Sequence, residues 1–82
     1  MKINPIGSNQ TEVETKDYFV LVSYKTPVAV RVRETNKVYV TSKKWSNTTS
    51  RHISSWLTEQ GLDRSSVEVE EKDQSFFDTL LD

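Results

Sequence analysis

Alternating apolar positions dominate the first half of the chain. Residues 18–24 (YFVLVSY) form a compact run rich in β-branched and aromatic residues, and residues 28–33 (VAVRVR) alternate valine with alanine or arginine. Residues 37–41 (KVYVT) alternate again after a turn-like segment in which Asn36 tolerates a left-handed backbone. Pro27 separates the first two runs because proline cannot donate a ladder hydrogen bond. A period of two residues is typical of half-buried strands, so these runs predict a three-stranded antiparallel meander.

The period changes after residue 45. Residues 46–50 (SNTTS) offer several helix N-caps, because their side-chain oxygens can accept hydrogen bonds from first-turn amides. Gly61 is suited to end a helix because a positive φ costs glycine little. Three apolar side chains between these signals share one helical stripe: Ile53, Trp56 and Leu57. The pattern predicts an amphipathic helix over residues 48–60. Its stripe is expected to pack against the valines of the sheet, namely Val28, Val30, Val32, Val38 and Val40.

Three further segments carry weaker patterns. Residues 1–16 show little apolar periodicity and are predicted to be a flexible N-terminal lead. Residues 66–70 (SVEVE) alternate briefly and are a candidate fourth strand. Residues 74–81 (QSFFDTLL) place four apolar side chains at helical spacing. This spacing suits either a short terminal helix or a linear motif that becomes ordered on a partner.

These patterns predict one small α+β domain. The expected fold is a three- or four-stranded antiparallel sheet with one amphipathic helix packed on one face. The expected organisation is a flexible lead over residues 1–16, the α+β domain over residues 17–73, and a C-terminal tail or short helix over residues 74–82. Because the apolar stripe lies upstream of the tail, removal of residues 74–82 is expected to leave the fold intact.

The charge distribution divides the chain. The net charge is −1, but residues 25–58 contain seven basic side chains and one acidic side chain, whereas residues 59–82 contain eight acidic and two basic side chains. Such asymmetry indicates an interaction surface, or two parts that attract each other. No stretch approaches the ~18 apolar residues of a membrane span, and none resembles a signal peptide. We therefore expect a cytoplasmic protein with no membrane partner.

The residue inventory argues against catalysis. The chain has no cysteine and a single histidine, His52, so it offers neither thiolate zinc ligands nor an evident set of nucleophile, base and orienting group. His52 borders the helix stripe and is interpreted as a structural or surface histidine. Glu68 and Glu70 alternate with valines and are interpreted as a solvent-facing strand edge, not a metal site. We expect a non-enzymatic protein with no metal and no cofactor.

Basic and aromatic side chains are interleaved around the predicted hairpin and the helix start. Sequence-tolerant nucleic-acid binding uses charge for phosphates and rings for stacking, and a helix N-terminus adds free amides. The alternative is a solvated edge hairpin followed by residues that only cap the helix. The candidate residues for binding nucleic acid or another anion are Arg31, Arg33, Lys43, Lys44, Trp45, Thr48, Thr49, Ser50 and Arg51.

Two motifs resemble those of a family of short, uncharacterised proteins found in bacteriophages and mobile elements. They are SYKTPVA at residues 23–29, and WSNTTSRHI at residues 45–53 followed by Trp56 and Leu57. Trp45 stands where tyrosine is more usual. The resemblance covers residues 18–57 and implies a small α+β fold and a phage-related setting, hence the host cytoplasm, but no activity. It also implies a polar network that locks the helix start to the first strand, with ligand binding as the alternative. The matching residues are Tyr24, Thr48, Thr49, Ser50 and His52.

The sequence leaves two classes of function open. The first is a nucleic-acid-associated accessory or regulatory protein that uses the basic hairpin and the helix start. The second is a protein-interaction module, such as an inhibitor of a host or phage enzyme, that uses the acidic tail. A homodimer is compatible with either class. The salt dependence of binding would separate them, because phosphate neutralisation gives a steep dependence on salt concentration.

Overall fold

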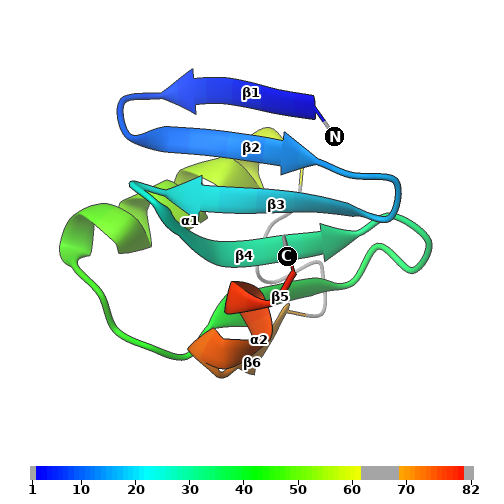
Figure 1. The fold of residues 1–82 in the computed structure, drawn as a ribbon. Coiled ribbons are helices and arrows are strands. Elements are labelled where there is room, and N and C mark those ends of the chain that lie inside the picture. The colour runs from blue at the N-terminus through cyan, green and yellow to red at the C-terminus, as the bar shows by residue number, and fades with distance from the viewer. Residues whose placement is uncertain (1, 62–68, 81–82) are drawn as a thin grey trace.

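The computed structural model describes residues 2–61 and 69–80, which form a six-stranded sheet with a helix on each face (Figure 1). The strands lie in chain order across the sheet: β1 (Lys2–Gly7), β2 (Gln10–Glu14), β3 (Tyr18–Ser23), β4 (Thr26–Val32), β5 (Val38–Thr41) and β6 (Val69–Lys72). The first five are antiparallel, whereas β6 is parallel to β5. The helices α1 (Asn47–Glu59) and α2 (Gln74–Asp78) define the α1 face and the α2 face of the sheet. The α+β class is confirmed, but the sheet is mixed and has more strands than expected.

Residues 2–14, expected within a flexible lead, instead form the hairpin of β1 and β2 (Figure 1). Val13 is buried because it lies between Ile3 on β1 and Val20 on β3. Asn9 lies in the turn with φ 60°, a left-handed conformation in which asparagine is enriched. The hairpin has few apolar residues, and its two strands are paired largely through backbone hydrogen bonds. Such bonds leave no hydrophobic pattern in the sequence, so the pattern does not predict these strands.

β1 forms one edge of the sheet, and its free side is interrupted by Pro5. Along a strand, the backbone N–H and C=O groups of successive residues point alternately to the two neighbouring strands. Thr15, which follows β2, donates its N–H to the carbonyl of Tyr18, so the odd-numbered residues of β2 bond to β3 and the even-numbered residues bond to β1. Pro5 lies opposite Thr11 and therefore faces outward, where its missing N–H costs no ladder hydrogen bond. This edge consequently offers few donors to an incoming strand.

A β-bulge in the β3–β4 pair changes which valines face the long helix. The register shifts between Leu21 and Val22 of β3, which leaves Val28 as an extra residue in β4. Val28 and Ala29 consequently both pack in the core of the α1 face, whereas Val30 packs on the α2 face. The prediction that Val28 and Val30 share the face under the helix is therefore wrong, because strict alternation does not allow for an inserted residue.

α1 begins and ends close to the predicted positions. Ser46 Oγ accepts a hydrogen bond from the amide of Thr49 at 3.1 Å, and Gly61 follows the helix with φ 72°. The apolar stripe packs against β3, β4 and β5. Trp56, which is 1% exposed, donates its indole N–H to a carboxylate oxygen of Glu12 on β2 at 2.9 Å. Packing and this bond together fix the helix across the meander.

α2 contributes directly to the hydrophobic core. A short terminal helix was one of the two forms predicted for this segment, and the structure shows that helix over Gln74–Asp78. Its Phe77 is fully buried in a cluster with Val13, Val20 and Val30 on the α2 face. The premise that the apolar core lies wholly upstream of the tail is therefore wrong, because the strands alone leave the α2 face of this cluster open.

β6 partly overlaps the candidate strand over residues 66–70, of which residues 66–68 lie outside the described residues. It runs parallel to β5 because the connection between the two strands contains α1. Glu70 is exposed, as expected for a strand edge, while Glu68 lies outside the described residues. Neither described helix is long and apolar enough to cross a bilayer.

Candidate functional site

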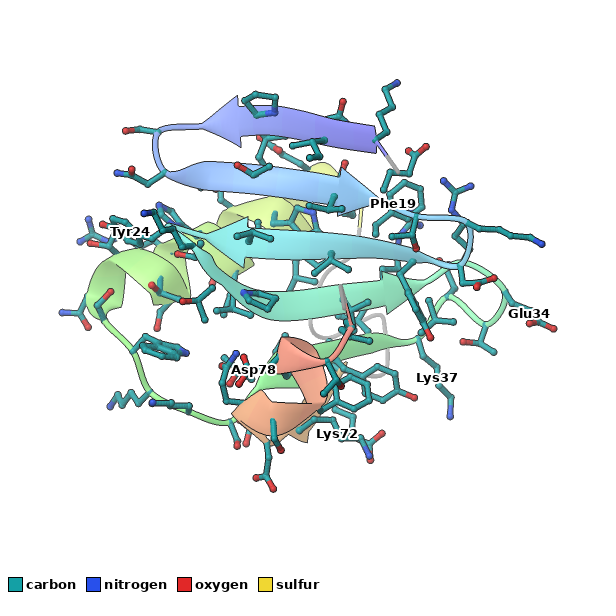
Figure 2. The ribbon with its side chains drawn as sticks, viewed as in Figure 1. Phe19, Tyr24, Glu34, Lys37, Lys72 and Asp78 are labelled. Carbon is teal, nitrogen blue, oxygen red and sulfur yellow. The ribbon has the colours of Figure 1, made fainter. Side chains whose placement is uncertain are left out.

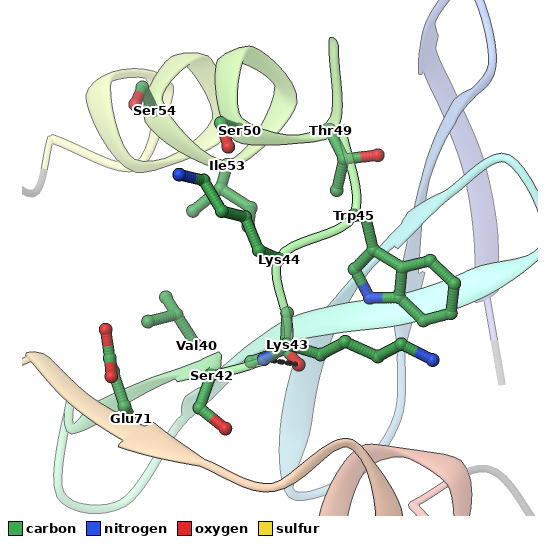
Figure 3. Close-up of a pocket in the computed structure, with 11 residues that line it drawn as sticks. Val40, Ser42, Lys43, Lys44, Trp45, Thr49, Ser50, Ile53, Ser54 and Glu71 are labelled. Atoms are coloured by element: carbon green, nitrogen blue, oxygen red, sulfur yellow. Dashed lines mark hydrogen bonds between the residues drawn. The ribbon is translucent and has the colours of Figure 1, made fainter. Parts of the chain in front are cut away.

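Two cavities adjoin at the end of the sheet where β3 turns into β4 and β5 leads into α1. The first, called here the Tyr24–Trp45 cavity, has a volume of about 290 Å³ and is lined by Ser23, Tyr24, Thr26, Val28, Trp45, Ser46 and Thr49. The second, the Lys44 cavity, has a volume of about 310 Å³ and lies between the end of β5, the start of α1 and Glu71 of β6 (Figure 3). Trp45 and Thr49 line both cavities. Two chemically different surfaces thus meet at one indole ring.

A buried polar network forms the floor of the Tyr24–Trp45 cavity. Ser23 Oγ lies 3.1 Å from Thr49 Oγ1 and 2.8 Å from His52 Nδ1. Thr49 Oγ1 also lies 3.3 Å from Ser46 Oγ. Ser23 is 2% exposed and His52 is 7% exposed, so their polar atoms need partners inside the protein. The network joins β3 to the first turns of α1, and it contains Thr49 and His52 of the residues that the resemblance singled out.

Ser23 and His52 have the spacing of a nucleophile and a base, but their surroundings suit a structural role. Both side chains are buried, and no carboxylate of residues 2–61 or 69–80 bonds to the imidazole. A base that activates serine is normally oriented by a third group. The same part of the chain contains no group of three or more side chains that could hold a metal ion. The pair fastens the helix start to the sheet.

Tyr24 lies at the rim of its cavity in a strained backbone conformation. It occupies the β3–β4 turn with φ 58°, and its N–H bonds to the carbonyl of Asn9 at 2.7 Å. A left-handed backbone is unusual for a bulky side chain and common for glycine in such turns. The ring is 53% exposed and packs against His52 with ring centroids 5.9 Å apart. The strained backbone places the aromatic ring against His52 and at the edge of the cavity.

Trp45 is held in position by α2 and by a neighbouring lysine. Its Nε1 donates to Gln74 Oε1 at 3.1 Å, and the same oxygen accepts a hydrogen bond from Thr41 Oγ1 at 2.8 Å. Lys43 Nζ lies 4.1 Å from the centre of the indole ring, a cation–π contact. The side chain is nevertheless 42% exposed. The ring is therefore oriented by the protein and still accessible to a ligand.

The structure brings five of the predicted site residues to the Lys44 cavity: Lys43, Lys44, Trp45, Thr49 and Ser50. Thr48 and Arg51 are exposed at the start of α1, beside these residues in the chain. Within the described ranges neither Lys43 nor Lys44 forms an ion pair, although Glu71 lines the same cavity. Their charges remain available to an anion.

Arg31 and Arg33 lie elsewhere, toward the other end of β4. Their guanidinium carbons lie 4.6 and 4.4 Å from the centre of the Phe19 ring, and Figure 2 shows Phe19 and Tyr24 at opposite ends of the sheet. Arg33 forms an ion pair with Glu14 at 3.1 Å, and Arg31 donates to Asn36 Oδ1 at 3.1 Å. The two arginines thus do not share one surface with the lysines. A strand advances about 3.3 Å per residue, which separates its two ends in space.

Two residues of this site are not apparent as such in the sequence pattern. Tyr24 matches a motif, but its contribution to a cavity with Trp45 depends on the meeting of two separate loops. A large aromatic in a tight turn between two strands is the signal that could have found it. Gln74 carries no such signal, because its bond to Trp45 joins positions 29 residues apart.

The comparison with protein families covers nearly the whole fold. The model of a family of unknown function, DUF8033, matches residues 1–75. The chain belongs to this family. No curated protein and no solved structure matches the chain. The DUF8033 match includes every described strand and both aromatic residues of the Tyr24–Trp45 cavity. The N-terminal hairpin is accordingly part of the family's domain.

Proposed function

We propose that this protein is a non-enzymatic accessory protein that binds nucleic acid through the surface around Trp45. The observation that carries the proposal is that two exposed aromatic rings, Tyr24 and Trp45, line one cavity while Lys43 and Lys44 lie directly beside it. Lysines attract phosphates and aromatic rings stack on bases. This combination is used by proteins that bind nucleic acid with little sequence preference.

The local charge supports this function although the whole chain carries a net charge of −1. Lys43 and Lys44 form no ion pair within residues 2–61 and 69–80, and the adjoining N-terminus of α1 contributes a partial positive charge. Arg51 is exposed in the same part of the helix. Because the number of basic groups is small, we expect moderate affinity that falls as salt concentration rises.

The test compares two double variants with the same change in charge. K43E/K44E reverses the lysines at the site, and K16E/K37E reverses two exposed lysines away from it. Fluorescence anisotropy with labelled oligonucleotides at two salt concentrations should show that K43E/K44E abolishes binding, while K16E/K37E weakens it only slightly. The melting temperature of both variants should stay close to that of the wild type, since exposed substitutions usually change stability by less than about 0.5 kcal/mol.

Two results would contradict the proposal. Equal losses of binding in the two double variants would mean that net charge alone, and not this surface, attracts the nucleic acid. A wild-type protein that binds no oligonucleotide even at low salt would remove the proposed function altogether.

A specific observation favours protein binding as a second candidate function. Four acidic side chains of the C-terminal segment are exposed and available to a basic partner surface: Glu70, Glu71, Asp73 and Asp78. In the phage-related setting that the resemblance implies, such a partner would be a host or phage enzyme. A pull-down with and without nuclease separates the two candidates. Partners bridged by nucleic acid are lost after nuclease treatment, whereas directly bound proteins remain.

A further inference from the structure

We propose that the Tyr24–Trp45 cavity holds one unstacked base of a single-stranded nucleic acid, an inference that rests on the proposed function. The cavity volume of about 290 Å³ lies just below the ~300–1,000 Å³ usual for ligand pockets. A site of this size suits a single planar group and not an extended ligand. Both rings at its rim are accessible, and stacking on exposed aromatic rings is how single-stranded nucleic acid is commonly bound.

The lining of this cavity is uncharged. Val28 is fully buried beneath the cavity, and the polar groups among the lining side chains are hydroxyls and an indole N–H that is already bonded to Gln74. No lysine, arginine, aspartate or glutamate is among the lining residues. A phosphate would find no charged partner here, whereas a neutral heteroaromatic ring would find aromatic and apolar contacts. The hydroxyls of Ser23, Ser46 and Thr49 already bond to one another and to His52, so the cavity favours a flat ring through stacking and does not select the hydrogen-bonding edge of a particular base.

The opposite side of Trp45 has the complementary chemistry. Lys43 and Lys44 line the Lys44 cavity, and Glu71 lies on β6, away from Trp45 in the view of Figure 3. A nucleotide is itself divided into a neutral flat base and an anionic phosphate. The indole ring therefore separates a cavity suited to the base from a surface suited to the phosphate. In a duplex the bases are paired and stacked, so a base can enter the cavity only from a single strand or after being extruded at an energetic cost.

The experiment uses the full chain and two labelled probes, an oligothymidylate and the same strand paired with oligoadenylate. The wild type should bind the single strand more tightly than the duplex. Trp45→Ala should weaken single-strand binding about 5- to 150-fold, which corresponds to the loss of about 1–3 kcal/mol of stacking on one base. Trp45→Phe should keep most of the affinity because it retains a ring. Neither variant should change the salt dependence, since the lysines remain.

Intrinsic fluorescence gives an independent measurement at the same site. Trp45 is 42% exposed and Trp56 is 1% exposed, so quenching of tryptophan emission by a bound base should come from Trp45. Trp45→Phe should bind the single strand without this quenching. Circular dichroism melts verify that each variant is folded.

The outcomes distinguish the inference from the function on which it rests. Equal wild-type affinities for single strand and duplex, together with unchanged binding by Trp45→Ala, would overturn the base pocket and leave nucleic-acid binding standing. Binding of the single strand with no change in Trp45 emission would also overturn it. Failure of the wild type to bind either probe would overturn the proposed function, and the base pocket with it.

Discussion

Replacement of Phe77 by alanine tests whether α2 is an integral part of the fold. Phe77 is fully buried against Val13, Val20 and Val30, which come from three different strands. Removing its ring leaves a cavity that these β-branched side chains cannot easily fill, because their positions are fixed by the backbone of the sheet. The substitution therefore loses both the transfer free energy of the ring and the contacts around the cavity.

The expected magnitude is large relative to the stability of a small domain. A buried Phe→Ala substitution costs about 3–5 kcal/mol, whereas the whole free energy of unfolding is typically about 5–15 kcal/mol. For a domain of this length the corresponding fall in melting temperature is about 12–40 °C. The matched control is Phe76→Ala, which removes a half-buried ring whose centroid lies 5.5 Å from that of Tyr39. Its loss should cost about 1–2 kcal/mol.

Urea denaturation followed by far-ultraviolet circular dichroism measures both free energies. The reasoning requires Phe77→Ala to be clearly less stable than Phe76→Ala, and deletion of residues 74–82 to be at least as damaging as Phe77→Ala. If the free energy of unfolding of Phe77→Ala lies within about 1 kcal/mol of the wild-type value, then α2 does not contribute the core contacts described for it.

Two further predictions concern the floor and rim of the Tyr24–Trp45 cavity. Tyr24→Gly should be about 1 kcal/mol more stable than Tyr24→Ala in thermal melts, because alanine keeps the strained left-handed backbone and glycine relieves it; equal melting temperatures would contradict the strain. His52→Leu should cost about 0.5–1.5 kcal/mol by removing one of the two hydrogen bonds of the buried Ser23 hydroxyl, and combining it with Ser23→Ala should cost less than the sum of the two single effects. Strictly additive free energies of unfolding in urea would argue against direct coupling of the two side chains.

The elements that the sequence predicts well are those with a strong periodic signal. α1 follows from its stripe and its caps, and β3, β4 and β5 follow from their alternation. The N-terminal hairpin does not, because only Ile3, Ile6 and Val13 give it apolar content, and its strands are stabilised mainly by pairing with a neighbour. The bulge at Val28 is also hidden, since it depends on how two strands align and not on either strand alone.

The candidate site shows the same division between local and long-range information. Lys43, Lys44 and Trp45 are adjacent in the chain, so their common location is evident from the sequence. Tyr24 lines the same cavity as Trp45 but comes from the β3–β4 turn, and nothing in either segment specifies that the two turns lie together. Arg31 carries a positive charge like the lysines but lies elsewhere, because its position in β4 puts it beside Phe19.

The late position of α2 in the chain has a consequence for synthesis. All described strands precede Phe77, so an incomplete chain that ends before this residue contains those strands but lacks the side chain that covers Val20 and Val30 on the α2 face. A sheet formed by such a chain presents apolar surface that the finished protein buries. Such transient exposure makes an incomplete chain prone to aggregation and open to chaperone binding. Closure of the α2 face thus marks the moment at which the newly made protein no longer needs that protection.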